Sequence, residues 1–230
     1  MQVIPSIDVS SVTDLSFQVK RLAPFYQRFQ IDYADGKFVQ FQTPPFQDLL
    51  DALVPFDGIV FDMHLMTSDY QKALDLLEQY KSRLNINLVF VHFGVKPSSE
   101  LILSDSSSFQ YGLVLNPEDT VDAIRQAYPL EKLKAIQIMS IIPGPQGNPF
   151  LPDTLNKIDQ LRLLDYRNPI FLDGGVNAGT LKIIKDRQNL PDFICPGSFF
   201  SKALNVEEPV QYLSEVLKNE DNTNKNISNH

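Results

Sequence analysis

Three side chains that can bind a metal ion or transfer a proton stand near the ends of apolar stretches. Asp32 closes an alternating apolar–polar run that begins at Phe29, and the Asp35–Gly36 pair that follows is a turn signal. His64 and Asp173 stand near the ends of two later apolar runs. Two carboxylates and an imidazole are a ligand set for a divalent ion. If the three strand ends converge, the sequence predicts a metal site.

The chain alternates short apolar runs with segments of helical periodicity. Strands are expected at 2–7, 29–34, 58–65, 87–92, 110–116, 134–139, 169–173 and 193–195, with helices between them at about 15–22, 43–53, 68–84, 98–103, 117–128, 153–165 and 178–187, and a last one at 200–217. Eight such units, with no GxGxxG fingerprint after the first strand, predict a (β/α)8 TIM barrel rather than a doubly wound sheet. We expect residues 1–217 to form one domain, and the polar segment 218–230 to be a disordered tail.

The predicted strand ends are polar, although the strands themselves are apolar. In a barrel these ends form one mouth, where the chemistry of such proteins takes place. They carry Ser6, Gln30, Asp32, His64, Met66, His92, Asn116, Met139, Asp173 and Ser198. His92 lies deeper in its strand pattern, so we interpret it as a core histidine satisfied by a hydrogen bond.

Glycines form a second group, after the sixth, seventh and eighth strands. Glycine lets the backbone approach an anion closely and exposes its amide N–H, and barrels frequently bind phosphate at the loops after strands seven and eight. Each turn alone could be ordinary turn chemistry, but three on neighbouring strands favour a phosphate cradle. Its members are Gly144, Gly147, Gly174, Gly175, Gly197 and Ser198.

Composition limits the function classes. The 230 residues carry a formal net charge of −8, which argues against a nucleic-acid partner but leaves a small anionic substrate open. Cys195 is the only cysteine, so neither an intrachain disulfide nor a cysteine metal site is expected. The sequence shows no membrane-length apolar run and no signal-peptide pattern, so we expect a cytoplasmic protein without a membrane partner. It leaves the oligomeric state open, and a homo-oligomer is among the states it allows.

Several short motifs occur in a recognisable order. They are PSI at 5–7, DGKFV at 35–39, DMHLM at 62–66, GLVLNP at 112–117, DGGVN at 173–177 and GS at 197–198. On these motifs the sequence resembles the ribulose-phosphate 3-epimerases and related pentulose- and hexulose-phosphate epimerases, from Pro5 to about Phe200.

The resemblance implies a metal-assisted inversion at C3 of a ketose phosphate, converting D-ribulose 5-phosphate to D-xylulose 5-phosphate through an enediolate. Asp32 and Asp173 match the two acid/base residues, which act on opposite faces of the substrate. These aspartates and His64 match the metal ligands. Ser6 matches a substrate-contacting serine, and Met66 and Met139 match the thioethers that pack over the enediolate.

The sequence departs from the family pattern at several of these positions. Gln30 stands where the family has a metal-binding histidine, and an amide oxygen suits Mg, Mn or Ca better than zinc; the ion could be Zn, Mn, Fe or Mg. Ala34 replaces a methionine, and Asp8 stands where the family tends to have an apolar residue. In the phosphate loop, Gln146 replaces a glycine, and Pro145 donates no N–H.

Three hypotheses therefore stay open. The protein is an active epimerase with an altered metal shell or substrate, a barrel of the same superfamily with another reaction on a sugar phosphate, or a catalytically silent barrel that binds a phosphorylated ligand or a partner protein. Keeping both aspartates favours activity, whereas the missing imidazole at Gln30 favours a silent site. The metal content of the purified protein would help to separate them.

Overall fold

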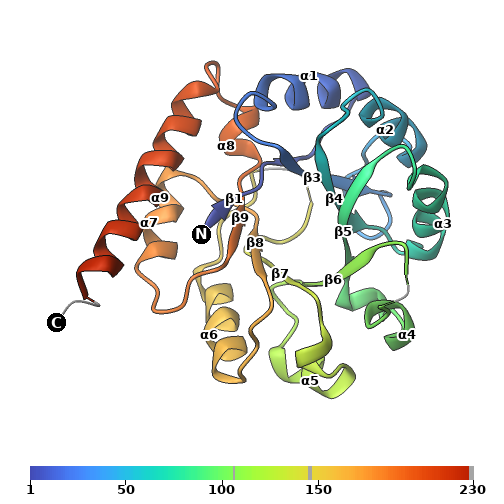
Figure 1. The fold of residues 1–230 in the computed structure, drawn as a ribbon. Coiled ribbons are helices and arrows are strands. Elements are labelled where there is room, and N and C mark those ends of the chain that lie inside the picture. The colour runs from blue at the N-terminus through green and yellow to red at the C-terminus, as the bar shows by residue number, and fades with distance from the viewer. Residues whose placement is uncertain (106, 145–146, 228–230) are drawn as a thin grey trace.

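The strands form one parallel sheet that curls into a barrel. The computed structural model describes residues 1–105, 107–144 and 147–227. Within these residues the strand order is β1-β9-β8-β7-β6-β5-β4-β3-β2. Because β1 and β2 are neighbours in the chain, the two ends of this order meet (Figure 1). This confirms the predicted (β/α)8 barrel. The strands are β1 (Gln2–Val3), β2 (Ser6–Ile7), β3 (Arg28–Ala34), β4 (Val60–Met66), β5 (Asn85–His92), β6 (Gln110–Leu115), β7 (Ile136–Met139), β8 (Ile170–Asp173) and β9 (Phe193–Cys195).

The helices surround the sheet on its outer face (Figure 1). Several begin at a residue whose side chain accepts a hydrogen bond from the first helical turn, as Ser11, Asp69 and Thr120 do, which satisfies an otherwise free backbone N–H. The α-helices are α1 (Val12–Leu22), α2 (Phe46–Leu53), α3 (Tyr70–Tyr80), α4 (Ser99–Ile102), α5 (Val121–Ala127), α6 (Asn156–Leu163), α7 (Ala178–Lys185), α8 (Ser198–Ser201) and α9 (Glu207–Ile227). Short 3-10 turns are η1 (Phe93–Val95), η2 (Leu130–Lys132) and η3 (Pro152–Leu155).

The first predicted strand is divided in the structure. Residues 2–7 form β1 and β2, which pair with β9 and β3 respectively. The division falls at Ile4 and Pro5, where Ile4 N still donates to Ile194 O on one side and Pro5 O accepts from Gln30 N on the other. Proline has no N–H to continue a ladder, so the chain changes partner there and closes the barrel.

The C-terminal region differs from the sequence prediction. A single helix was expected at 200–217, but α8 and α9 are separate, and α9 continues to Ile227. The expected disordered tail from Lys218 stays a prediction; the structure assigns residues 218–227 to α9, and residues 228–230 lie outside the described ones. The helix is anchored by buried Leu213. Residues 218–227 contain neither proline nor glycine, which would interrupt a helix. They extend a helix that has already formed, so they do not need a new nucleation step.

The described core has a large part between sheet and helices, a second part inside the barrel and a small cluster of Ala34, Val39 and Met66. The inner part is filled by side chains such as Phe90, Phe171 and Ile4, all at most 2% exposed. Gly112 provides room for Phe90, because a Cβ atom at position 112 would lie 2.4 Å from the Phe90 ring. The barrel is thus a packed core rather than a channel, and only its end is open to a ligand.

The N-terminal ends of the strands are held by an ion pair in which Asp62 is buried and Arg28 is partly exposed. Arg28 donates to both carboxylate oxygens of Asp62 at 2.8 and 3.0 Å, and its guanidinium also lies over the rings of Phe171 and Phe193. Asp62 accepts further hydrogen bonds from Asn87 Nδ2 and Leu88 N. This aspartate is fully used by the fold and lies two residues below His64 on the same strand.

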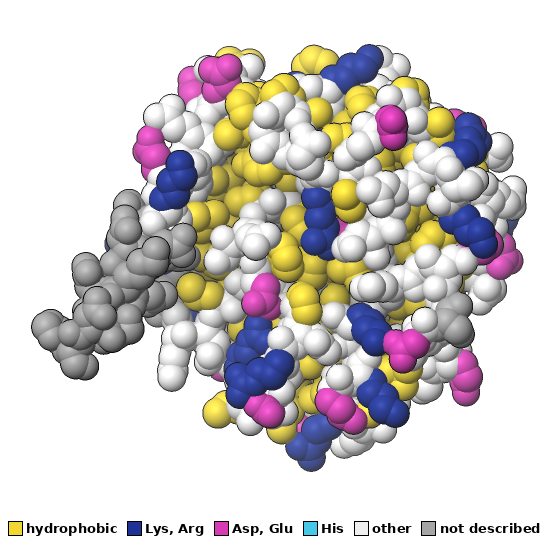
Figure 2. Space-filling model, viewed as in Figure 1, with side chains coloured by type: hydrophobic (Ala, Val, Ile, Leu, Met, Phe, Trp, Pro, Cys, Tyr) yellow, Lys and Arg dark blue, Asp and Glu magenta, His cyan; other side chains and the backbone are white. Residues whose placement is uncertain are grey.

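On the face shown in Figure 2, the acidic and basic side chains of the described residues are interspersed among apolar ones. A strong site for an anion therefore depends on local groups rather than on a broad basic surface. Among the described residues, no helix combines the length and the apolar character needed to cross a membrane.

Candidate active site

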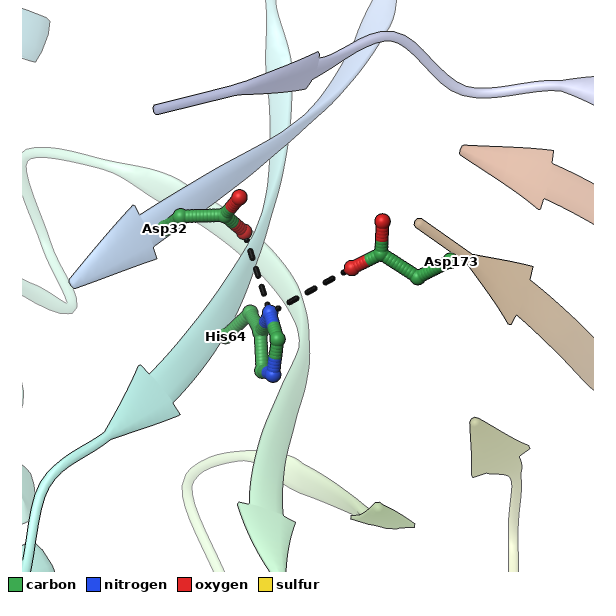
Figure 3. Close-up of side chains that lie close together, drawn as sticks. All are labelled: Asp32, His64 and Asp173. Carbon is green, nitrogen blue, oxygen red and sulfur yellow. Dashed lines mark hydrogen bonds and ion pairs between the residues drawn. The ribbon is translucent and has the colours of Figure 1, made fainter. Parts of the chain in front are cut away.

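Asp32, His64 and Asp173 meet at the C-terminal ends of β3, β4 and β8. His64 Nδ1 lies 3.0 Å from Asp32 Oδ1 and 3.4 Å from Asp173 Oδ2, so one ring nitrogen faces both carboxylates (Figure 3). One potential ligand atom from each residue lies within 4.8 Å of the others, and all three residues are buried. The group could hold a metal ion.

The strand register explains why these residues meet. Asp32 pairs with His64 across β3 and β4, and Met139 pairs with Asp173 across β7 and β8. Side chains alternate between the two faces of a strand; Gln30 and Asp32 therefore point to the same side. Both are buried inside the barrel mouth, at 0% and 7% exposure.

Gln30 occupies the centre of this group. Its Nε2 donates to Asp173 Oδ2 at 2.6 Å and to Asp32 Oδ1 at 3.0 Å, and lies 3.4 Å from His64 Nδ1. As oriented, the amide presents a donor to the three potential metal ligands, and the amide nitrogen is not a ligand. Its Oε1 is buried without a hydrogen-bond partner. Rotating the carboxamide would exchange the two ends and direct that oxygen at the same point.

A chain of buried hydrogen bonds fixes the orientation of His64. Asn116 Oδ1 lies 2.9 Å from His92 Nδ1, and His92 Nε2 lies 2.9 Å from His64 Nε2. An amide oxygen only accepts, so His92 carries its proton on Nδ1, and its Nε2 accepts the proton of His64 Nε2. His64 therefore presents Nδ1 to Asp32 and Asp173, which is the arrangement that outer partners impose on metal-binding histidines.

The carboxylates at the site favour positive charge at this point. Burial lowers the pKa of His64, but the hydrogen bond to Asp32 and the charges of Asp32, Asp173 and Asp8 outweigh it and raise the pKa overall. Burial, followed by the charge of His64, lowers the pKa of His92 well below its usual value. Burial and the charge of Asp32 raise the pKa of Asp173. Nδ1 of His64 thus holds a proton or faces a metal ion.

The glycines predicted as a phosphate cradle line the same cavity as the carboxylates. The cavity is bordered by Ser6, Asp8, Asp32, His64, Met66, Met139, Ile141, Gly144, Gly147, Asp173, Gly174, Gly175, Cys195, Gly197 and Ser198. Gly174 adopts φ +100°, and a Cβ atom there would lie 2.5 Å from Ile141 Cγ1, so only glycine fits this turn. The structure thus brings together every predicted site residue, Gln30 lying beneath the cavity against Asp32 and Asp173.

The chain is similar to known proteins over most of its length. The profile of the Ribulose-phosphate 3 epimerase family matches residues 2–200. The chain belongs to this family. It is 29% identical over 196 residues to a ribulose-phosphate 3-epimerase of Buchnera aphidicola, covering 82% of each chain. It is 31% identical over 199 residues to the chloroplastic ribulose-5-phosphate-3-epimerase of Arabidopsis thaliana, covering 81% of this chain and 68% of the other. As a member of the epimerase family, the protein is a carbohydrate isomerase.

Solved structures show the same fold at low identity. KGPDC from Streptococcus mutans, in complex with D-R5P, has a TM-score of 0.68 at 12% identity, covering 94% of this chain and 97% of the other. Orotidine 5'-phosphate decarboxylase from Pyrococcus horikoshii has a TM-score of 0.59 at 13% identity, covering 92% and 96%. At this identity the likeness supports the barrel architecture alone.

Two polar groups at this candidate site were missed as site residues. Gln137 Nε2 donates to Asp173 Oδ2 at 3.0 Å, and it could have been recognised as a polar residue two positions before Met139 on the same strand face. Asp8 was noted only as a departure from the family pattern. His92 is a hydrogen-bonded core histidine, as interpreted, but the bond orients His64. Pro145 and Gln146 lie outside the described residues.

Proposed function

We propose that this protein inverts C3 of a ketose phosphate, converting D-ribulose 5-phosphate to D-xylulose 5-phosphate. The observation that carries the proposal is the pair Asp32 and Asp173, two buried carboxyl groups from separate strands that face one point in a glycine-lined cavity. Epimerisation needs a base on one face of the carbon and an acid on the other, and two carboxyl groups supply both without a further group.

The proton transfers follow from this arrangement. One aspartate, as carboxylate, takes the C3 proton, and the electron pair of the broken C–H bond moves toward the neighbouring carbonyl to give an enediolate. The other aspartate, as carboxylic acid, returns a proton to C3 from the opposite face. After one turnover the aspartate that took the proton is protonated and the other is ionised, so Asp32 and Asp173 have exchanged protonation states. Their roles are exchanged in the reverse reaction. Ser6 Oγ, which donates to Asp32 Oδ2 at 2.8 Å, holds Asp32 in position.

The residues present fit a divalent ion. Asp32, His64 and Asp173 would hold it through two oxygens and one nitrogen, and the unpartnered Oε1 of Gln30 would add a fourth ligand after the carboxamide rotates. Such an ion, from the set Zn, Mn, Fe and Mg, supplies positive charge that favours negative charge on the enediolate oxygens. Carboxylate and amide oxygens make the harder ions of that set the better match.

The glycine turns support a phosphorylated substrate. Gly144, Gly147, Gly174 and Gly197 border the cavity and follow β7, β8 and β9. Lys202 brings a cationic group to this loop cluster, because its Nζ would lie 3.5 Å from a Cβ atom at position 147. Backbone amides and one nearby ammonium suit a phosphate ester.

Solvent isotope exchange tests this function. The protein is incubated with D-ribulose 5-phosphate in D2O, with each of Zn, Mn, Fe and Mg, and deuterium at C3 is followed by NMR. We expect metal-dependent exchange and formation of D-xylulose 5-phosphate, both lost in Asp173→Asn. No exchange with any ion would contradict the proposal and leave a silent barrel or another sugar-phosphate reaction. The cytoplasmic location and a homo-oligomeric state stay predictions.

A further inference from the structure

Asp8 is a carboxyl group in the cavity that the proposed proton transfers do not use. It follows β2, and it lines the same cavity as Asp32, Asp173 and Ser198. Its Oδ1 atom is buried and has no hydrogen-bond partner. Burial, followed by the charges of Asp32 and Asp173, raises the pKa of Asp8 to about 8, against a smaller lowering effect of His64.

Two other aspartates among the described residues, Asp35 and Asp62, have partners. Asp35 accepts hydrogen bonds from the backbone N–H groups of Lys37, Phe38 and Ser68. Asp62 is bonded to Arg28 and to Leu88 N, as described above. A buried polar atom without a partner is unfavourable for folding. The unpartnered oxygen of Asp8 therefore does not help to hold the fold together.

Asp8 Oδ1 can accept a hydrogen bond in the carboxylate and, as the carbonyl oxygen, in the carboxylic acid, so it suits a hydrogen-bond donor. A phosphate group and a ketone present acceptor oxygens, and a phosphate also carries negative charge, which Asp32 and Asp173 disfavour. No lysine or arginine is among the described residues that line the cavity, and the ammonium group of Lys202, which lies near Gly147, is not among the charges that act on Asp8. The remaining groups on a ketose phosphate are its hydroxyls, which donate.

We propose that Asp8 Oδ1 accepts a hydrogen bond from a hydroxyl of the substrate's carbon chain and so positions the sugar over Asp32 and Asp173. The inference rests on the proposed function for its ligand class, a hydroxylated sugar phosphate. Asp8 is then a specificity residue of this chain: it recognises the polyol part of the ligand, while the glycine turns bind the phosphate.

The test measures binding without turnover. Isothermal titration compares D-ribitol 5-phosphate, which keeps the hydroxyl chain but has no carbonyl, with inorganic phosphate. For Asp8→Leu we expect the Kd of ribitol 5-phosphate to rise roughly ten-fold, as for a lost hydrogen bond to a buried carboxyl group. The Kd of phosphate should stay the same or fall, since the variant removes no group that binds phosphate. Asp8→Asn keeps an acceptor oxygen and should change the Kd of ribitol 5-phosphate far less.

Stability provides the readout that separates positioning from structure. The melting temperature of Asp8→Leu should equal or exceed that of the wild type, and Asp8→Ala replaces it if the leucine variant does not fold. Asp14→Leu, on the exposed side of α1, is the control for loss of one surface charge and should change neither Kd.

The proposal is overturned if wild type does not bind ribitol 5-phosphate, if Asp8→Leu binds it as wild type does, or if phosphate binding weakens equally. Failure of the epimerase function is a separate result, because it appears as absent isotope exchange by a wild type that still binds ribitol 5-phosphate.

Discussion

Replacing Asp8 with leucine should stabilise the fold, and the gain should grow as the pH rises from 5 to 7. In the folded protein the pKa of Asp8 is raised from 3.8 to about 8. Between these values the folded state keeps the proton while the unfolded state releases it. The contribution of Asp8 to the free energy of unfolding therefore has its full value below about pH 4 and is lost as the pH rises toward 8.

The size of the effect follows from the same shift. A full unit of pH in this interval changes the free energy of unfolding by about 1.4 kcal/mol per proton. Two units give about 3 kcal/mol as an upper value, and water that reaches the rest of the Asp8 carboxyl reduces it, so we expect roughly 1–3 kcal/mol. Leucine has no such titration, so the pH dependence of the difference between the two proteins reports Asp8 together with its electrostatic coupling to Asp32, Asp173 and His64.

Urea unfolding of wild type and Asp8→Leu at pH 5, 6 and 7 measures this difference directly. The gap in the free energy of unfolding should widen with pH in favour of the variant. A gap that stays constant within about 0.5 kcal/mol, or that closes as the pH rises, would show that Asp8 is not a buried carboxyl of raised pKa.

Three further changes give separate tests. Asp173→Asn should lower turnover by roughly 10³-fold or more while circular dichroism stays unchanged, because it removes one acid/base and keeps the side-chain shape; turnover near the wild-type rate would sink the two-aspartate mechanism. Gln30→His should raise zinc affinity at least about ten-fold, measured by chelator competition, because imidazole is the better zinc ligand; an unchanged affinity would mean that position 30 does not contact the ion. Gly112→Ala should destabilise the fold by about 1–3 kcal/mol in urea unfolding, since the added Cβ would lie 2.4 Å from Phe90, and a neutral effect would contradict the tight packing inside the barrel.

The periodicity of the sequence was sufficient to predict the barrel architecture and to predict which residues lie at the barrel mouth. Alternation in β3 places Gln30 and Asp32 on one face, and the repeated strand-and-helix pattern predicts a barrel whose strand ends meet. These inferences depend on short-range rules of the backbone, so they hold without knowledge of distances. The exceptions in the fold, the change of partner at Pro5 and the extension of α9 to Ile227, arise where tertiary pairing or helix propagation overrides local composition.

The sequence by itself determined which side chains stand at the mouth; the tertiary structure decided what each one contacts. Only the closed barrel brings the Gln30 amide between two carboxylates. The farther one, that of Asp173, lies 143 residues from Gln30 in the sequence. Only the packing of β4, β5 and β6 lines up His64, His92 and Asn116 so that one proton position sets the next. The same holds for Asp8, whose type is plain in the sequence but whose missing partner is not. Hydrogen bonds are decided within a few tenths of an ångström, and that precision comes from barrel closure and strand register, which no local pattern of residues encodes.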